Sequence, residues 1–292
     1  MSFTAEPLIS IVVPSFNQGQ FLEQTLCSIL GQNYKNLELI VIDGGSTDET
    51  LDVIKKYSSQ IAYFVSEADD GQASAINKGF RVAKGDVLAW LNSDDMYLPC
   101  TLMKVASYFK TPGELKLVYG GTLHFFEGKS SAYGFLPSPF NQERLTYSDY
   151  IMQSSTFWSR SLWEKVGEIK ESYNYVLDWD WFIRAAKVCE FIPVADYLSL
   201  YRFHDTHKSG TGEIKRIDEI LSVVNDYADS KWIEIYQDLY QQLPSLRKGF
   251  SRLRRLNLYK FRYLFYPKLY MKYGKENMDF ALNMFYLPEF IP

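Results

Sequence analysis

The first third of the chain alternates short apolar runs with helical stretches, and this alternation limits the folds that it can adopt. Four runs rich in β-branched and aromatic residues are separated by turns and helical stretches. Strands that alternate with helices at this spacing form a parallel sheet covered by helices on both faces. The predicted strands are residues 8–14, 37–43, 61–67 and 86–91, and the predicted helices are residues 21–30, 47–57 and 72–83.

A polar cluster follows each of the four predicted strands. In an open parallel sheet, ligands bind outside the carboxyl ends of the strands, so these positions are candidates for a binding site. Because all four clusters lie at the same edge of the sheet, we expect them to form one site. The clusters are SFN at 15–17, DGGSTD at 43–48, EADDGQ at 67–72 and NSDD at 92–95.

The alternation becomes irregular after residue 117, and the last part of the chain is mostly helical in pattern. Further helices are predicted at 159–166 and 179–188, with an apolar run at 191–194. A chain of 292 residues that is 47% hydrophobic can bury a full core. We expect an α/β domain over residues 1–212 and a helical C-terminal extension over 213–292.

Cysteine content and hydropathy exclude several classes of protein. The three cysteines are far apart and show no metal-ligand spacing, so neither a disulfide framework nor a zinc site is predicted. The N-terminus does not resemble a signal peptide, and no run approaches the roughly 18 apolar residues of a membrane span. We therefore expect a protein of a reducing compartment that is neither secreted nor membrane-spanning.

Charge is distributed unevenly along the chain. Residues 247–275 contain ten Lys or Arg and no Asp or Glu, whereas the remaining 21 basic residues stand against 35 acidic ones. Such segregation predicts an anionic partner for the tail, either nucleic acid or lipid headgroups.

The NSDD cluster is the strongest candidate for a metal site. Asp94 and Asp95 are adjacent carboxylates directly after an apolar strand, and their repulsion needs a cation or hydrogen bonds to offset it. Mg²⁺ and Mn²⁺ favour carboxylate oxygens together with phosphate and water. The alternative is a turn or helix cap, since Asp and Ser favour both.

The DGGSTD cluster also has two interpretations. Gly44 and Gly45 allow a tight turn, and Ser46 or Thr47 can cap the following helix. Asp43 at the strand end can instead accept a hydrogen bond from a ligand such as a base. The cluster lacks the GxGxxG spacing of a dinucleotide fold and the GK[ST] of a P-loop, which argues against both classes.

A third acidic segment lies at 175–186, YVLDWDWFIRAA. Asp178 and Asp180 stand at the start of a predicted helix, where a carboxylate can serve as a cap. Trp179 and Trp181 flank them, and aromatic faces stack on sugar rings while a carboxylate accepts a hydroxyl proton. A helix cap and a sugar site both remain open on these residues alone.

Seven segments in a fixed order, from residue 7 to residue 209, resemble the family 2 glycosyltransferases with the GT-A fold. The resemblance implies an α/β nucleotide-sugar-binding fold with a central, mostly parallel sheet. It also implies an inverting enzyme that transfers a sugar from a nucleotide-diphosphate sugar, most commonly a UDP-sugar, to a hydroxyl acceptor. The segments are PSFN, DGGSTD, SEADDGQASAINKGF, GDVLAWLNSDDMYLP, QSSTFWSRSLWEKVG, DWDWFIR and YRFHDTHKS.

The resemblance implies roles for individual residues on the donor side. Asp94 is expected toward the ribose and Asp95 toward a divalent metal, Mg²⁺ or Mn²⁺. His204 occupies the place of a late histidine that completes the metal sphere, with His207 as the alternative. Ser74 stands where many relatives carry aspartate, so it receives no role. The residues expected to bind the nucleotide are Pro14, Phe16, Asn17, Asp43, Asp69, Gly71, Asn77 and Asp94.

On the acceptor side, the resemblance makes Asp178 the general base and Asp180 a supporting residue. A metal-neutralised nucleoside diphosphate is a good leaving group, so one carboxylate suffices to deprotonate the acceptor, and a single displacement inverts the anomeric centre. Trp179, Trp181 and Arg184 are expected beside the acceptor.

Two other functions are compatible with parts of the pattern. A sugar nucleotidyltransferase also needs a metal and an α/β fold, but it should carry a glycine-rich basic loop after the first strand, and PSFNQG has no Lys or Arg. A catalytically silent assembly subunit of a polysaccharide machine is the second alternative, which the intact acidic residues oppose.

If the chain is a glycosyltransferase, the partner of its basic tail can be predicted. Acceptors in cell-surface polysaccharide or glycolipid synthesis are lipid-linked, so we expect residues 247–275 to bind the anionic inner face of a membrane and not nucleic acid. The protein would then be cytoplasmic and peripheral. The alternative is a helix packed on the catalytic domain with solvated cations. Apolar side chains at three- and four-residue steps predict a helix up to Pro267, through Leu246, Phe250, Leu253, Leu256, Tyr259, Tyr263 and Tyr266.

Overall fold

The structure, a computed structural model, describes residues 6–205, 207–208, 212–256 and 262–285 of the chain. Two compact units make up the molecule. The first comprises residues 1–142 and 150–207, and the second comprises residues 143–149 and 208–292. This division falls a few residues before the boundary expected after residue 212, and it gives the second unit a short segment from within the first part of the chain.

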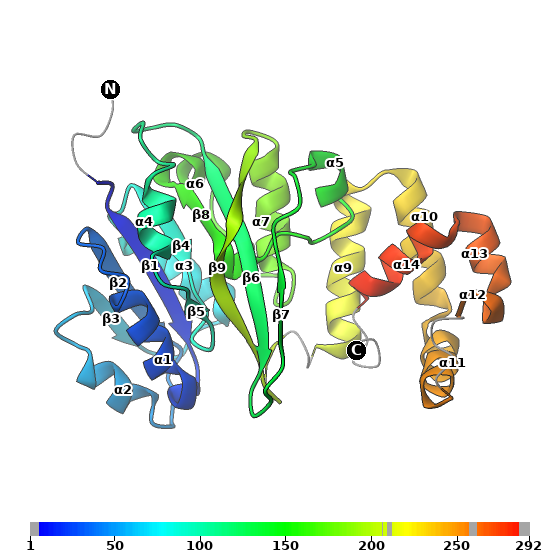
Figure 1. Cartoon of the computed structure of the whole chain (residues 1–292), viewed down its shortest axis with the longest axis horizontal. Helices are drawn as coiled ribbons and strands as arrows, with labels where there is room; N and C mark the ends of the chain where they lie inside the picture. The colour runs from blue at the N-terminus through cyan, green and yellow to red at the C-terminus, as the bar shows by residue number, and fades with distance from the viewer. Residues whose placement is uncertain (1–5, 206, 209–211, 257–261, 286–292) are drawn as a thin grey trace. The chain divides into compact units, whose positions relative to one another are not determined.

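Within the described residues, the first unit is built on a nine-stranded sheet (Figure 1). The order is β3-β2-β1-β4-β8-β6-β9-β5, and β7 pairs with β6. The first four strands are parallel neighbours, as predicted, whereas β8 pairs antiparallel with both β4 and β6. The predicted α/β fold is therefore confirmed. The strands are β1 Ile9–Ser15, β2 Leu37–Asp43, β3 Tyr63–Ser66, β4 Val87–Trp90, β5 Met96–Tyr97, β6 Leu117–Phe126, β7 Ala132–Phe135, β8 Thr156–Ser159 and β9 Phe191–Phe203.

Helices cover both faces of the parallel strand β1, which explains why every residue of β1 is buried. Ile11 and Val13 of β1 belong to a core that also contains Leu22 and Leu26 of α1. Val12 points to the other face, against α3, where Gly79 allows the helix to approach the strand. The helices of this unit are α1 Gly19–Leu30, α2 Thr50–Lys56, α3 Gln72–Val82, α4 Thr101–Ala106, α6 Arg160–Val166 and α7 Leu177–Ala186, with the 3₁₀ helix η1 Gln153–Ser155. The short helix α5 Gln142–Leu145 belongs to the second unit from its second residue onward.

Two elements differ from their predicted bounds for reasons that involve distant partners. The helix expected from residue 47 begins at Thr50, because the Asp48 carboxylate accepts hydrogen bonds from the N–H of Thr50 and from the N–H of Gly19 on α1. The apolar run at 191–194 is only the start of β9, which continues to Phe203 because it pairs with β6 along nearly its whole length.

The described elements of the second unit are helices. Its inner side chains include Ile220 and Ile235, which are fully buried. Residues 143–149 belong to it because the Tyr147 ring stacks on Trp232 at 3.9 Å between centroids, and Tyr236 donates a hydrogen bond to the Tyr147 carbonyl. The helices are α9 Glu213–Tyr227, α10 Ser230–Gln241, α11 Leu243–Arg255, α12 Arg262–Phe265, α13 Pro267–Tyr273 and α14 Lys275–Met284.

The basic tail is not the single helix that its periodicity predicted. Helix α11 ends at Arg255, and Pro267 opens α13, where the missing N–H of proline costs no intrahelical hydrogen bond. Tyr259, which belongs to the predicted apolar pattern, lies outside the described residues. Across the part of the chain that the structure describes, no helix has both the length and the apolar character needed to cross a bilayer.

Candidate active site

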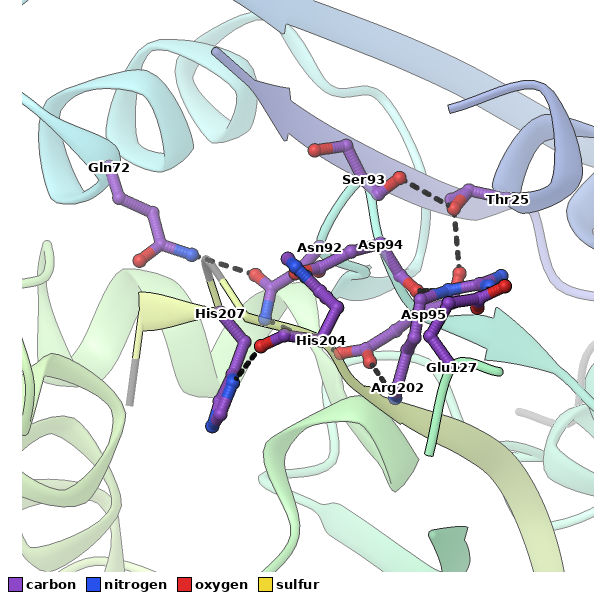
Figure 2. Close-up of polar contacts among 10 residues, drawn as sticks. All are labelled: Thr25, Gln72, Asn92, Ser93, Asp94, Asp95, Glu127, Arg202, His204 and His207. Carbon is purple, nitrogen blue, oxygen red and sulfur yellow. Dashed lines mark hydrogen bonds and ion pairs between the residues drawn. The ribbon is translucent and has the colours of Figure 1, made fainter. Parts of the chain in front are cut away.

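Asp94 and Asp95 follow β4, but they occupy different environments (Figure 2). Asp95 is only 1% exposed, and its Oδ1 accepts a hydrogen bond from the backbone N–H of Arg202 on β9 at 3.1 Å. Burial, together with the nearby Asp94 charge, raises the pKa of Asp95 well above its ordinary value. The Asp94 side chain is 19% exposed, and its Oδ2 lies 3.0 Å from Nε2 of His204. Of the two carboxylates, Asp94 is therefore the one that faces the histidine.

His204 comes directly after the end of β9 and lies against α1. Its ring packs on Phe21 at 4.5 Å between centroids, which orients Nε2 toward Asp94. His207 bonds instead through Nδ1 to the carbonyl oxygen of His204, and its ring is 5.9 Å from that of His204. The geometry favours His204 over His207 as the residue paired with an aspartate.

This arrangement pairs the residues differently from the assignment made from the sequence, and the metal and ribose roles stay predictions. We expected Asp95 and His204 to share the metal and Asp94 to bind the ribose, but His204 contacts Asp94. Asp95 is turned toward β9, where its carboxylate accepts the Arg202 N–H. Spacing could not distinguish the two adjacent aspartates, because the direction of each side chain depends on the partner that β9 brings beside the loop.

The loop that carries the two aspartates is held from both sides. The Thr25 hydroxyl of α1 lies 2.9 Å from the carbonyl oxygen of Ser93 and 2.7 Å from that of Asp95. At the start of α3, Gln72 donates through Nε2 to Asn92 Oδ1 at 2.7 Å (Figure 2). The first turn of α3 and the aspartate loop thus form one edge of the site, as the order of the polar clusters predicted.

The Asp43 carboxylate forms hydrogen bonds mainly with residues of its own loop. Its carboxylate is fully buried and accepts hydrogen bonds from the N–H groups of Gly45 and Ser46 and from the hydroxyls of Ser46 and Ser66. These contacts shape the DGGSTD turn. They favour a structural role for Asp43, and a contact with a base stays a prediction.

Two other predicted nucleotide-binding residues, Phe16 and Asp69, border Gly44, and a third, Gly71, bonds to Asp69. A Cβ placed on Gly44 would lie 3.1 Å from Asp69 Oδ2 and 3.3 Å from Phe16 Cδ2, so both side chains border that backbone. Phe16 is 60% exposed, while Asp69 Oδ1 accepts the N–H of Gly71, which has φ of 106° at the start of α3. The exposed aromatic face and the partly exposed carboxylate leave room for a ligand beside the glycine turn.

The remaining residues of the first strand end and α3 are structural. Pro14 is buried at the end of β1, and Asn17 Oδ1 accepts the N–H of Thr47 at 2.9 Å. The Asn77 carboxamide exchanges two hydrogen bonds with the backbone of Ile169 and is 1% exposed. The donor and acceptor of Asn77 both fix α3 to the segment before α7, which favours a structural role, and its nucleotide contact stays a prediction.

Asp180 and its aromatic neighbours form part of the core, which argues against the predicted places of Trp179 and Trp181 beside the acceptor, whereas the supporting role of Asp180 stays a prediction. Asp180 is fully buried, with Lys170 Nζ at 2.8 Å and Arg184 Nε at 2.9 Å. Arg184 also donates to the carbonyls of Val166 and Glu168, so its cation is held inside the unit. Trp179 and Trp181 are likewise fully buried and cannot stack on a sugar.

Asp178 stands apart from these buried residues. It lies in the first turn of α7, is partly exposed, and accepts the N–H of Trp179 through Oδ1 at 2.9 Å. The segment leading to it passes the start of α3, since a Cβ on Gly71 would lie 3.6 Å from Asn174 Oδ1. Asp178 is therefore the better candidate of the two for a reacting carboxylate.

One charged residue of the site was missed in the sequence. Arg202, only 2% exposed, contacts Asp94, Asp95 and Glu127 (Figure 2). The feature of the sequence that could have indicated it is an arginine within the mostly apolar run LSLYRF. Such an arginine marks either a strand end or a buried, paired cation.

Comparison with known proteins identifies the family. The profile of glycosyl transferase family 2 matches residues 10–161, which is more than half of the chain. The chain belongs to glycosyltransferase family 2. This membership makes it a glycosyltransferase and removes the sugar nucleotidyltransferase alternative.

Relatives of this glycosyltransferase occur in distant bacteria. It is 29% identical over 254 residues to an uncharacterised glycosyltransferase of Rickettsia typhi, a match that covers 84% of this chain and 77% of the relative. It is 32% identical over 184 residues to a PGL/p-HBAD biosynthesis glycosyltransferase of Mycobacterium tuberculosis, covering 62% of this chain and 70% of that protein.

Solved structures confirm the GT-A fold of the glycosyltransferase. The mannosyltransferase PcManGT from Pyrobaculum calidifontis, in complex with GDP-Man and Mn²⁺, has a TM-score of 0.61 at 17% identity and covers 98% of this chain and 86% of its own. Residues 1–349 of S. aureus TarS, in complex with UDP-GlcNAc, have a TM-score of 0.58 at 15% identity and cover 86% and 78%. At such low identity these likenesses concern the fold alone.

Proposed function

We propose that this glycosyltransferase is an inverting enzyme that uses a divalent cation to bind a nucleotide-diphosphate sugar and transfers the sugar to a hydroxyl of a lipid-linked glycan. The observation that carries the proposal is the approach of His204 Nε2 to within 3.0 Å of Asp94 Oδ2 at the carboxyl end of β4. These residues come from segments far apart in the sequence, and each is a metal-ligating type.

The chemistry of the residues fits a divalent cation shared with a diphosphate. Among the described residues, no group of three or more His, Cys, Asp and Glu side chains is arranged to hold a metal. A carboxylate and an imidazole would therefore hold the ion together with phosphate oxygens and water. Mg²⁺ demands oxygen ligands, so the imidazole of His204 favours Mn²⁺. When bound, the cation offsets the charge of the diphosphate and improves it as a leaving group.

On the donor side, Phe16 and Asp69 border the Gly44 turn and are the residues that we expect to meet the nucleoside. Phe16 offers an exposed aromatic face to a base, and Asp69 offers a carboxylate to a ribose hydroxyl or an N–H group. Uridine is the proposed base, as in the resemblance drawn from the sequence, and TarS binds UDP-GlcNAc on a similar fold.

On the acceptor side, Asp178 is the proposed general base. Its partial exposure in the first turn of α7 lets the carboxylate accept the proton of the acceptor hydroxyl as the oxygen attacks the anomeric carbon. A single attack of this kind inverts the anomeric centre. Asp180, buried between Lys170 and Arg184, would only support the helix that carries Asp178.

The basic tail is proposed to hold the enzyme at the anionic inner face of a membrane, which would make it cytoplasmic and peripheral. Leu246 and Leu253 pack inside the second unit, whereas Leu256, Leu264 and Met271 are exposed by 64%, 62% and 77%. Each cation near an anionic surface contributes about 1 kcal/mol of binding, and the exposed apolar side chains add interfacial burial. The described exposed cations of the tail are Lys248, Arg252, Arg255, Lys268, Lys272 and Lys275.

Thermal-shift measurements test the donor. UDP, GDP and dTDP are each added with and without Mn²⁺, and a nucleotide at 100-fold its Kd should add about 2.7 kcal/mol of stability. We expect the largest shift with UDP and Mn²⁺ together, and release of free sugar from the matching donor would show that the enzyme is active. Nucleotide binding undiminished by EDTA would contradict the role of the cation.

Vesicle co-sedimentation tests the membrane proposal. The full-length protein should bind phosphatidylglycerol vesicles at low salt and dissociate as salt is raised, and replacing Lys248, Arg252 and Arg255 by Gln should weaken binding strongly. The matched control replaces the exposed Lys35, Lys110 and Lys187 by Gln, which lie outside the tail. Equal binding by the two variants, or tighter binding to RNA than to vesicles, would contradict the assignment.

A further inference from the structure

A buried guanidinium, that of Arg202, lies behind the aspartate loop and in contact with several elements (Figure 2). It is placed between two aromatic rings, with its central carbon 4.7 Å from the Phe21 centroid and 4.8 Å from the Phe125 centroid. Its planar cation is fixed in direction by these rings, because an arginine stacks on aromatic faces and cannot rotate freely between two of them.

The donors of Arg202 divide between the aspartate loop and its surroundings. Nε donates to the carbonyl oxygen of Asp94 at 2.9 Å, and the backbone N–H of the same residue donates to Asp95 Oδ1 at 3.1 Å. On the other edge, one terminal nitrogen donates to Gln24 of α1 at 2.6 Å, and the other pairs with Glu127, whose side chain is half exposed. Arg202 thus ties the loop to β9, to α1 and to the end of β6.

These contacts also set the place of His204. The histidine follows Arg202 by two residues, and successive residues of an extended chain advance by about 3.3 Å each. Because Arg202 joins its own strand to the backbone of Asp94, a shift of the loop relative to β9 would change the separation between Asp94 and His204. Phe21 reinforces the link, since its ring packs on both Arg202 and His204.

We propose that Arg202 is a positioning residue that holds Asp94 and His204 at the separation needed to bind the divalent cation of the donor complex. This inference rests on the proposed function. It differs from a general role in stability, which would lower the melting temperature of a variant without changing the affinity of the folded protein for the cation.

The test compares Arg202→Lys and Arg202→Met with the wild type in the full-length chain. Lysine keeps the positive charge but has a single terminal nitrogen, which cannot reach Asp94, Gln24 and Glu127 together. Binding of Mn²⁺ to the protein saturated with UDP is measured from the electron paramagnetic resonance signal of free Mn²⁺. Binding of UDP alone is measured by calorimetry in EDTA, and melting temperatures are recorded for all variants.

We expect both variants to bind Mn²⁺ at least tenfold more weakly than the wild type, with UDP affinity in EDTA unchanged within twofold. High Mn²⁺ should restore transfer by Arg202→Lys. The matched control is Glu127→Gln, which removes the charge of the outer partner and leaves the bonds of Arg202 to the loop in place, so its Mn²⁺ affinity should stay within threefold.

Mn²⁺ affinity equal to that of the wild type in folded Arg202→Lys would overturn the inference, even if the variant melts at a lower temperature. Should Arg202→Met fail to fold, the lysine variant still decides. If the wild-type protein itself binds no Mn²⁺ with UDP, GDP or dTDP, the proposed cation site is wrong and the positioning role of Arg202 falls with it. If the wild type and Arg202→Lys bind Mn²⁺ equally well, the cation site stands and only the positioning role is wrong.

Discussion

Replacing each aspartate of the DWD segment separates the two roles assigned to them. Asp180 is fully buried between Lys170 and Arg184, so Asp180→Asn removes a negative charge that pairs two cations. Breaking a buried ion pair on one side costs about 3–5 kcal/mol. Because Lys170 and Arg184 are partly exposed and Arg184 keeps its two carbonyl partners, we expect a cost below this range, about 2–3 kcal/mol.

Asp178→Asn is expected to behave in the opposite way. The asparagine retains an oxygen that can accept the Trp179 N–H, so the helix start and the stability should be preserved. Without a carboxylate to take the acceptor proton, kcat should fall by roughly 10²–10⁴ while donor binding remains.

Urea unfolding, thermal melting and transfer kinetics of the two variants provide the assay. A loss of about 2–3 kcal/mol should lower the melting temperature of Asp180→Asn by roughly 5–10 °C. Lys170→Met serves as the control, because the Lys170 side chain is 42% exposed and Asp180 keeps Arg184 as a partner, so the loss of stability should be smaller than for Asp180→Asn. The reasoning is refuted if Asp180→Asn abolishes turnover at unchanged stability while Asp178→Asn remains active.

Three further outcomes follow from individual contacts. Burial lowers the pKa of His124 to about 4 in the folded protein, from its ordinary value of 6.5. At a pH between these two values, the unfolded chain therefore binds more protons than the folded chain. The free energy of unfolding should then fall by up to about 1.4 kcal/mol per pH unit toward pH 4, and urea titrations of His124→Phe should lack that part of the slope. Gly79→Ala places a Cβ 2.4 Å from Val12 Cγ1 and should cost about 1–3 kcal/mol in denaturant unfolding, whereas Ser74→Ala on the same helix should be close to neutral; equal stabilities would contradict the close packing. Phe16→Ala should weaken UDP binding roughly tenfold or more by calorimetry if the exposed ring stacks on the base, and unchanged affinity would remove the ring from the site.

The fold and the family were accessible from the sequence because they depend on local pattern. The run at residues 39–42, LIVI, is apolar on both faces, which marks a parallel strand covered on both faces. The turn residues after each run then place the site at one edge of the sheet. Helix bounds were less accurate where a side chain from another element, such as Asp48 bonded to Gly19, decides where the helix begins.

The partner of each site residue was decided only by the tertiary structure. Asp94 and Asp95 are the same residue type and are adjacent in sequence. Their partners differ because of the way β9 approaches the loop: the Arg202 N–H bonds to Asp95, and His204 bonds to Asp94. Likewise, Asp178 and Asp180 alternate along one helix, whose packing buries the second against Lys170 and Arg184 and leaves the first partly exposed. Residue type and spacing determine which chemistry a segment can offer. The direction of a side chain, its burial and its charged neighbours arise from contacts between distant segments, such as Asp94 and His204, which are 110 residues apart, and a linear pattern does not contain them.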